Sequence, residues 1–265
     1  MRRYAKAAFL IGVVIILYFG AGAVLLRFAV ERHTIVSAEL PSSKGEALTA
    51  RTVGSGTSGC VVVFPGRHGP SPAYEAAVVP PLTRRDVKVI LMSYPARASL
   101  NEIRELARLA VNEVTKECAN VVLVGRSLGS MVAAYASRDA RVVGLLLEST
   151  SPRFSTAIRR EFGRRWYLRP MDLLPVGYLV PEDYSLTDAF HDSRVPRTVI
   201  LQGADDKQTP LTDLTDSGAL PPGVVLLPVA HADHSNVFSR ALPKYIETIL
   251  DMLRRPDERE DTPTH

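Results

Sequence analysis

The residues best suited to chemistry begin with a serine between two glycines, in the run Gly125-Arg126-Ser127-Leu128-Gly129. A serine hydroxyl is a weak nucleophile, so it needs a nearby base, and the base needs an acid to orient it. Two later segments offer these groups. The run ILQGADDKQTP contains Asp205 and Asp206, and the run LLPVAHADHSNVF contains His231 and His234. Together they indicate nucleophilic acyl chemistry.

The two glycines have a steric reason. The five residues match the G-x-S-x-G pattern, in which the chain leaves a strand, turns sharply and enters a helix, with the serine in a strained conformation. Side chains two residues before and after Ser127 would collide in such a turn, so Gly125 and Gly129 are expected. The pattern alone is weak, because it also arises by chance. The alternative for Ser127 is a simple helix N-cap.

The surrounding elements alternate between strands and helices. Expected helices cover residues 101–117, 128–137 and 242–253, and apolar runs expected to be strands cover residues 60–64, 87–92, 121–124, 142–147, 198–202 and 224–227. Continuous apolar runs indicate strands buried on both faces, which is typical of a parallel sheet between helices. The sequence therefore predicts an α/β fold. Ser127, the aspartates and the histidines then lie at carboxyl ends of strands, where such sheets build their sites.

Residues 152–194 interrupt this alternation, and we expect them to form a small helical cap over the carboxyl edge of the sheet. The segment is rich in arginine, and Phe154, Ile158, Phe162 and Trp166 recur at four-residue spacing. The plainer interpretation is a solvated basic helix face with an apolar inner stripe. The alternative is a lid that meets lipid headgroups or an anionic substrate.

The N-terminal segment, residues 1–30, predicts a transmembrane anchor. A nearly unbroken apolar run from Ala7 to Leu26 follows basic residues, and about 20 apolar residues span a bilayer. Basic charge before the run favours a cytoplasmic N-terminus and an extracytoplasmic domain, either periplasmic or extracellular. A cleaved signal peptide with Ala21-Gly22-Ala23 as its cleavage site and a buried core helix remain as alternatives. Residues 31–58 are expected to be a connector with the first strands, residues 59–253 the catalytic domain, and residues 254–265 a flexible tail.

Composition narrows the class of protein. A chain of 265 residues is long enough for one α/β domain, and its net charge of +4 is too small and scattered to indicate nucleic-acid binding. Neither the two cysteines nor the histidines have zinc-binding spacing, so no metal and no organic cofactor is expected.

The chain resembles the α/β-hydrolase superfamily, and within it the small serine hydrolases of the Bem46-like group. That group pairs a GRSLG-type turn with an acid loop of the form G-x-x-D-x-x-x-P, and Gly203, Asp206 and Pro210 have these spacings here. The resemblance implies Asp206 as the acid, with Asp205 as its alternate. Glu148, at the end of the strand after the serine turn, is a minor alternative acid.

The same resemblance assigns the base and the oxyanion donors. His234, followed by a small and an amide residue, is most similar to the family's histidine, and His231 is its alternate. The backbone amides of Leu128 and Arg67 are expected to stabilise an oxyanion. The family has His-Gly in the loop that carries the second donor, whereas this chain has Pro65-Gly66, a departure that leaves a backbone donor in place.

The fold implied by the resemblance also brings the two cysteines together. The strand that starts at Cys60 and the strand after Cys118 are neighbours in it, and both cysteines lie at its amino-terminal edge. Their α-carbons can then approach within the range of a disulfide, which fits an oxidising compartment. The alternative is a pair of free, buried thiols.

The sequence thus predicts a membrane-anchored serine hydrolase that cleaves a carboxylic ester or thioester, as an esterase, lipase or thioesterase does. Its expected partners are a small-molecule or lipid-like acyl substrate and the membrane, with no nucleic acid. A serine peptidase of the same fold and a non-catalytic membrane scaffold are the alternatives, because the fold alone does not fix the reaction.

Overall fold

The computed structural model describes residues 2–32, 48–95, 98–138, 141–164, 166–180, 183–191, 193–218 and 220–254. Most of the expected connector, from residue 33 to residue 47, and the expected tail from residue 255 onward lie outside the described residues.

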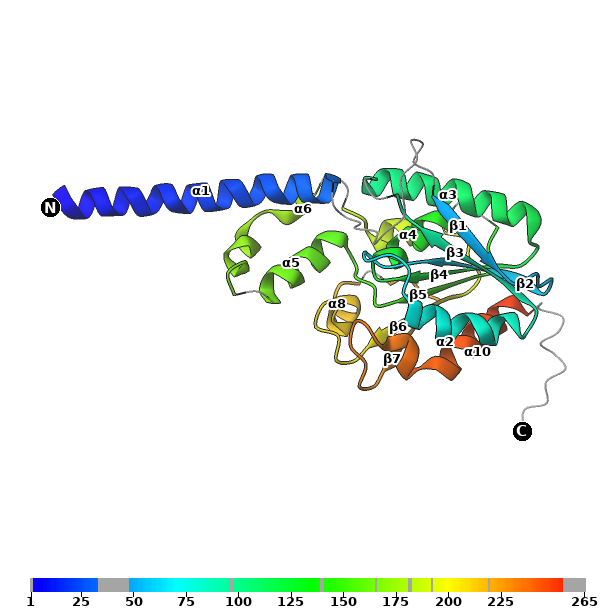
Figure 1. Ribbon diagram of the computed structural model, residues 1–265. Helices are drawn as coiled ribbons and strands as arrows, with labels where there is room; N and C mark the ends of the chain where they lie inside the picture. The colour runs from blue at the N-terminus through cyan, green and yellow to red at the C-terminus, as the bar shows by residue number, and fades with distance from the viewer. Residues whose placement is uncertain are drawn as a thin grey trace.

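The described residues form one sheet of seven strands, in the order β1-β3-β2-β4-β5-β6-β7. The strands are β1 (Thr49–Val53), β2 (Gly59–Phe64), β3 (Val87–Ser93), β4 (Val121–Arg126), β5 (Gly144–Glu148), β6 (Thr198–Gly203) and β7 (Val224–Val229). β1 pairs with β3 antiparallel, and the other pairs are parallel. The prediction of a mostly parallel sheet is confirmed (Figure 1).

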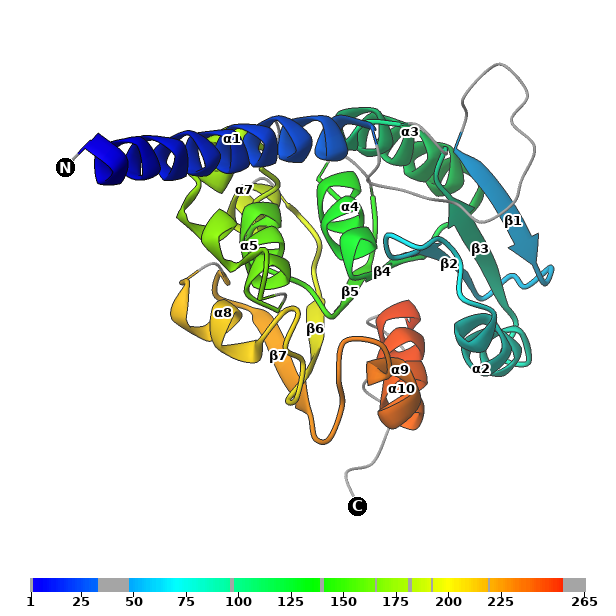
Figure 2. The ribbon, with the colours of Figure 1, turned by 60° about the vertical axis from the view of Figure 1, so that its left-hand side comes forward.

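Helices cover both faces of this sheet. The helices of the described residues are α1 (Arg2–Arg32), α2 (Pro72–Thr83), α3 (Leu100–Glu117), α4 (Leu128–Ala136), α5 (Phe154–Arg164), the 3-10 helix η1 (Arg169–Leu173), α6 (Val176–Leu179), α7 (Leu186–His191), α8 (Leu211–Asp216), α9 (Val237–Arg240) and α10 (Leu242–Leu253). α3, α4 and α7 pack on one face, and α2, α9 and α10 pack on the other (Figure 2).

The sequence of β2 shows why this layering forms. Successive side chains of a strand point to opposite faces, so Val62 and Phe64 join the core under α3 and α4, whereas Val61 and Val63 join the core under α2 and α10. Every residue of β2 is buried. The continuous apolar run therefore supplies both cores from one central strand, as expected for a strand covered on two sides.

The N-terminal segment folds as α1, a helix of 31 residues. Its first half projects beyond the domain (Figure 1). Within the described part of the chain, no helix combines the length and hydropathy needed to cross a bilayer. The prediction of a membrane-spanning helix over residues 7–26 is therefore not supported by the structure.

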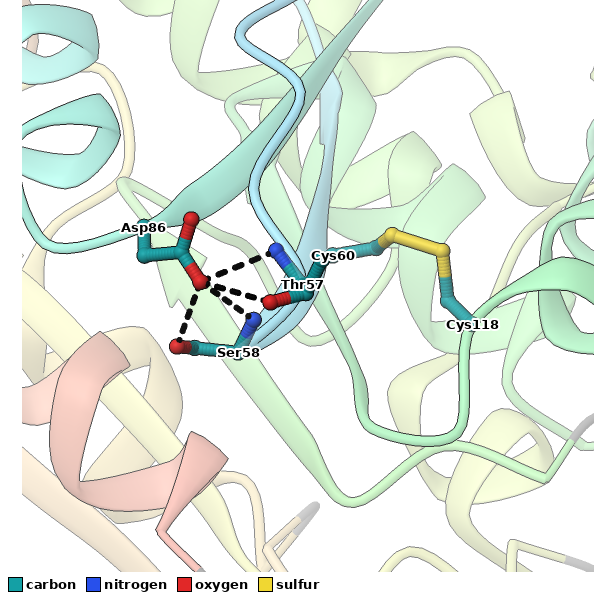
Figure 3. The surroundings of a disulfide bond; sticks show 5 residues. All are labelled: Thr57, Ser58, Cys60, Asp86 and Cys118. Carbon is teal, nitrogen blue, oxygen red and sulfur yellow. Dashed lines mark hydrogen bonds between the residues drawn. A yellow bond between two sulfur atoms is a disulfide. The ribbon is translucent and has the colours of Figure 1, made fainter.

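The amino-terminal edge of the sheet carries a disulfide between Cys60 and Cys118, whose α-carbons are 6.1 Å apart (Figure 3). Cys60 lies in β2, and Cys118 caps the C-terminus of α3, just before β4. The carboxylate of the neighbouring Asp86 accepts hydrogen bonds from the backbone and hydroxyls of Thr57 and Ser58. The bridge thus ties together the starts of two adjacent central strands.

Candidate active site

Ser127 occupies the tight turn between β4 and α4. Its φ of 52° and ψ of −118° are unusual for a residue with a side chain, and such conformations persist only where the surrounding structure holds them. The Ser127 amide donates a 2.8 Å hydrogen bond to the Glu148 carbonyl at the end of β5, which fixes the turn to the sheet.

The two flanking glycines are needed for packing. A Cβ on Gly125 would overlap the backbone of Gly129 and Ser130, and a Cβ on Gly129 would overlap the carbonyl groups of Phe64 and Pro65. The first overlap shows how closely the turn folds back on itself, and the second shows how closely α4 approaches the end of β2. Both glycines therefore have the steric role that the sequence suggested.

His234 joins the serine to an acid. Its Nε2 lies 2.9 Å from the Ser127 Oγ, and its Nδ1 lies 2.9 Å from an oxygen of Asp206. His234 comes from the loop after β7, and Asp206 comes from the loop after β6. Parallel strands bring these loops to one edge of the sheet, so residues far apart in the sequence form one hydrogen-bonded chain. Such a chain can carry the hydroxyl proton to the imidazole.

Asp206 is held as a carboxylate. Its side chain is buried, and its oxygens accept hydrogen bonds from the amides of Gln208 at 2.8 Å and Thr209 at 2.9 Å, and from the Thr209 hydroxyl at 2.7 Å. Burial opposes the charged form, but the hydrogen bonds from His234 and Thr209 outweigh it and keep the pKa of Asp206 below its ordinary value. A charged Asp206 suits the task of orienting His234.

Two residues that the sequence analysis did not single out support this acid. Thr209 lies between Asp206 and His234, with its Oγ1 3.2 Å from the His234 Nδ1. The buried Gln202 donates to the Thr209 Oγ1 at 3.0 Å and accepts from the Thr150 amide at 3.0 Å. A polar Gln202 within the apolar run of β6 was the sequence signal for this network, because buried polar side chains need partners.

The structure brings neither alternate to the serine. His231 and Asp205 lie 4.0 Å from one another, with 89% and 65% of their side chains exposed. Glu148, the minor alternative acid, is buried and accepts hydrogen bonds from Arg126 at 2.9 Å and Tyr245 at 3.1 Å. It therefore belongs to a packed network on the far side of the turn.

The segments expected to supply oxyanion donors lie beside Ser127. Leu128 is the first residue of α4, and first-turn amides have no partner within their own helix. Gly66 begins a turn closed by a 3.0 Å hydrogen bond from the Gly69 amide, and a Cβ on Gly66 would lie 3.4 Å from the Cβ of Ser127. Arg67 follows Gly66 in this turn.

The disulfide partners Cys60 and Cys118 lie at the other edge of the sheet, away from this site. Within the residues whose placement is described, no group of three or more histidine, cysteine, aspartate or glutamate side chains could hold a metal ion.

Solved structures with the same fold include several ester hydrolases. The esterase EaEST of Exiguobacterium antarcticum has 16% identity and a TM-score of 0.57, covering 83% of this chain and 100% of that one. The monoacylglycerol lipase of Paleococcus ferrophilus has 15% identity and a TM-score of 0.54, covering 78% and 98%. The metagenomic α/β hydrolase MGS-MChE2 has 21% identity and a TM-score of 0.56, covering 84% and 100%.

At these identities the likeness establishes the fold. A search of curated proteins by sequence gives no match. The comparisons do not identify a subgroup, so the resemblance to the Bem46-like group stays a prediction. The model of the alpha/beta hydrolase family matches residues 61–262, which is most of the chain, and the protein therefore belongs to that family.

Proposed function

We propose that this protein is a serine hydrolase that cleaves a carboxylic ester or thioester with Ser127, His234 and Asp206. The observation that carries the proposal is the hydrogen-bonded chain from the Ser127 Oγ through His234 to Asp206, with both distances at 2.9 Å. A serine on a strained turn, a histidine on its hydroxyl and a buried carboxylate behind the histidine are the parts that acyl transfer needs.

The reaction follows from the positions of these groups. The Ser127 Oγ attacks the acyl carbon as His234 Nε2 takes the hydroxyl proton, and the carbonyl oxygen becomes an oxyanion near the amides of Leu128 and Arg67. The bond to the leaving alkoxide or thiolate breaks, and His234 gives it the proton, which leaves an acyl-serine. Water then attacks the acyl carbon and gives a proton to His234. The bond between the acyl carbon and the Ser127 oxygen breaks, and His234 returns the proton to that oxygen, which releases the acid and restores the serine hydroxyl.

The choice of an ester or thioester has the support of the structural neighbours, which include an esterase and a monoacylglycerol lipase. The peptidase alternative uses the same residues, so comparison of ester and peptide substrates separates the two. The non-catalytic scaffold alternative does not require the alignment of Ser127 with His234.

Reaction with a fluorophosphonate probe and hydrolysis of p-nitrophenyl esters of short and long chain test the proposal. We expect the wild-type protein to react with the probe and to hydrolyse at least one ester, and the Ser127→Ala variant to do neither. Ser239→Ala, which removes an exposed hydroxyl of α9, is the matched control and should retain both activities. Equal hydrolysis by wild type and Ser127→Ala would contradict the proposal.

We also propose that α1 attaches the protein to a membrane, with the domain outside the cytoplasm. The apolar side chains of α1 support attachment, because Phe9, Ile16 and Leu17 are more than 60% exposed and such surfaces mark interaction sites. A disulfide supports an oxidising compartment.

Fractionation and a C-terminal alkaline phosphatase fusion in a bacterial host test the location. We expect the full chain in the membrane fraction and an active fusion. An inactive fusion would contradict the extracytoplasmic placement, and N-terminal sequencing of the purified protein decides between an anchor and cleavage near Ala21-Gly22-Ala23.

A further inference from the structure

The segment of residues 152–194, which contains α5, η1, α6 and α7 and which we call the cap, carries bulky apolar side chains in water-exposed positions on and around η1 and α6. Trp166 and Leu173 are each 82% exposed, and Tyr178 is 91% exposed. We call these three residues the cap surface. An exposed apolar patch marks a site of interaction with a protein or a membrane.

The cap meets α1 beside these residues. The Tyr18 hydroxyl donates a hydrogen bond to the Tyr167 carbonyl, and Met171 packs so closely on Gly22 that a Cβ there would overlap it. Figure 1 shows α1 running past α6, with its first half continuing beyond the domain. The second half of α1 therefore lies against the cap.

The points of contact lie within the apolar run of α1. A helix rises about 1.5 Å per residue, so Tyr18 is roughly 12 Å and Gly22 roughly 6 Å inside the end of that run at Leu26. A lipid surface that meets the exposed apolar side chains of α1 therefore comes close to the cap segment that contacts this helix. Side chains such as Trp166 and Tyr178 are those enriched at the membrane interface.

Basic side chains gather in the first part of the cap. Residues 152–194 contain seven arginines and six acidic residues, and six of these arginines but one of these acidic residues lie within residues 152–169. Arg159 and Arg164 have about half of their side chains exposed, at 48% and 51%, and Arg169 is also exposed. Basic side chains beside aromatic and aliphatic ones are the pattern of surfaces that lie on anionic lipid.

The cap also touches the loop that holds the acid. Arg164 donates to the Gln208 side chain at 3.2 Å, and Arg160 forms an ion pair with Asp213 in α8. The Gln208 amide in turn donates to Asp206. A surface bound through the cap would therefore lie beside the loop that carries Asp206.

We propose that the cap surface docks on an anionic lipid bilayer next to α1, so that the protein takes its acyl substrate from the membrane. The source of the substrate rests on the proposed hydrolase function, whereas the docking itself does not. Contact with lipid explains the exposed apolar residues, the exposed arginines of residues 152–169 and the contact with α1 together. A second copy of the chain or another protein would explain the exposed apolar residues alone.

Trp166 provides the test, because it is the single tryptophan of the chain. The full chain is reconstituted into vesicles of phosphatidylcholine, with and without phosphatidylglycerol, and with normal or brominated acyl chains. We expect Trp166 emission to be blue-shifted and quenched by the brominated lipid, more strongly when phosphatidylglycerol is present. Ser127→Ala should give the same spectra, because docking needs no catalysis.

Three results would overturn parts of the proposal. Emission that is quenched by aqueous iodide and untouched by brominated lipid would place the cap surface in water. Emission shielded from both quenchers would show that protein covers the cap. Equal quenching with and without phosphatidylglycerol would overturn the anionic preference.

A kinetic test links docking to substrate supply. We expect Leu173→Ser combined with Tyr178→Ser to lower the rate on a vesicle-borne ester roughly ten-fold, because two apolar anchors are lost from the interface. The rate on a soluble short-chain ester should stay the same. Leu109→Ser, which changes an exposed leucine of α3 outside the cap, is the matched control and should alter neither rate.

The two rates separate failure of the docking proposal from failure of the hydrolase proposal. Equal vesicle rates for the double variant and the wild type would overturn the supply of substrate from the membrane. A wild-type protein with no Ser127-dependent activity on any ester, yet with quenched Trp166, would overturn the hydrolase proposal and leave the docking proposal standing.

Discussion

The carboxyl ends and the amino ends of the adjacent strands β2 and β4 carry different structural features. At their carboxyl ends, β2 leads into the Gly66 turn and β4 leads into the strained Ser127. At their amino ends, Cys60 pairs in register with Val121, and a disulfide to Cys118 ties the two strands together. The same pair of strands therefore carries Ser127, the proposed nucleophile, at one end and a disulfide at the other.

The strained turn at the carboxyl edge costs stability, whereas the disulfide at the amino edge adds it. A residue in an unusual backbone conformation costs on the order of 1–3 kcal/mol, which the rest of the fold must supply. A disulfide that closes a loop of this length stabilises a protein by about 4 kcal/mol in the chain-entropy model. We therefore expect changes at the carboxyl edge to affect activity and changes at the amino edge to affect stability.

Replacement of the base gives the largest expected effect. His234→Ala should lower kcat/KM for an ester by about 10⁵-fold or more, since the hydroxyl loses its proton acceptor. The thermal midpoint should change little, because the side chain is partly exposed. His231→Ala, at the surface, is the matched control, and a loss there as large as that of His234→Ala would break the assignment.

The acid is expected to come next. Asp206→Asn keeps the shape of the side chain but no longer holds the imidazole in the required tautomer, so kcat should fall by about 10⁴-fold. Asp205→Asn, one residue away and exposed, should stay near the wild-type rate in the same assay. Similar rates for the two variants would mean that the charge behind His234 has no part in the reaction.

The amino edge should respond in the opposite way. The double variant Cys60→Ala/Cys118→Ala should lose about 4 kcal/mol of unfolding free energy in urea titrations, because the bridge spans 58 residues of chain. Its kcat/KM, measured where the variant is folded, should stay near that of wild type. A large loss of kcat/KM in the folded variant would show that the disulfide also positions Ser127.

A smaller effect is expected at Thr209. Thr209→Val keeps the volume but removes the hydroxyl that bridges Asp206 and His234, so kcat should fall roughly ten-fold, the equivalent of one hydrogen bond to a charged group. Thr209→Ser, which retains the hydroxyl, should restore the rate. Failure of the serine variant to restore it would assign the loss to packing.

The smallest expected effect is on the stability of the fold at low pH, and it involves one aspartate at each edge of the sheet. Because the pKa of Asp206 is lower in the folded protein, its contribution to stability is present above the unfolded pKa, near 4, and is lost as the pH falls through the folded pKa. Asp86 at the amino edge has a pKa lowered by hydrogen bonds from Thr57 and Ser58. In urea unfolding at a series of pH values, the free energy of unfolding should therefore fall less steeply with decreasing pH for Asp206→Asn and for Asp86→Asn than for the wild type. Of these two variants, Asp86→Asn should keep its activity and Asp206→Asn should lose it.

The sequence predicted the central strands well because their signal is local. The run beginning at Val121 is apolar without a break and the run beginning at Val87 is interrupted only by Lys88, and the strands start at those residues. The closing helix covers residues 242–253 as expected, since its apolar residues recur at helical spacing. The glycines around Ser127 were also a local signal, because steric limits act over two residues.

Other features depended on contacts that no short pattern contains. α2 went unpredicted because it contains Pro80 and Pro81, which argue against a helix, yet its first turn is capped by Ser71 and it packs on the sheet. The position of Thr209 between Asp206 and His234 arises only when two loops meet. The contact that distinguishes His234 from His231, the 2.9 Å approach of its Nε2 to the Ser127 Oγ, likewise arises only in the tertiary structure.

The most direct test of the account is to locate the adduct of a fluorophosphonate by peptide mass spectrometry on the full chain. The account predicts one modified residue, Ser127, with a modification rate that falls steeply in His234→Ala and not in His231→Ala. An adduct on another serine, or a Ser127 that reacts equally fast without His234, would contradict the claim that the hydrogen-bonded chain activates this hydroxyl.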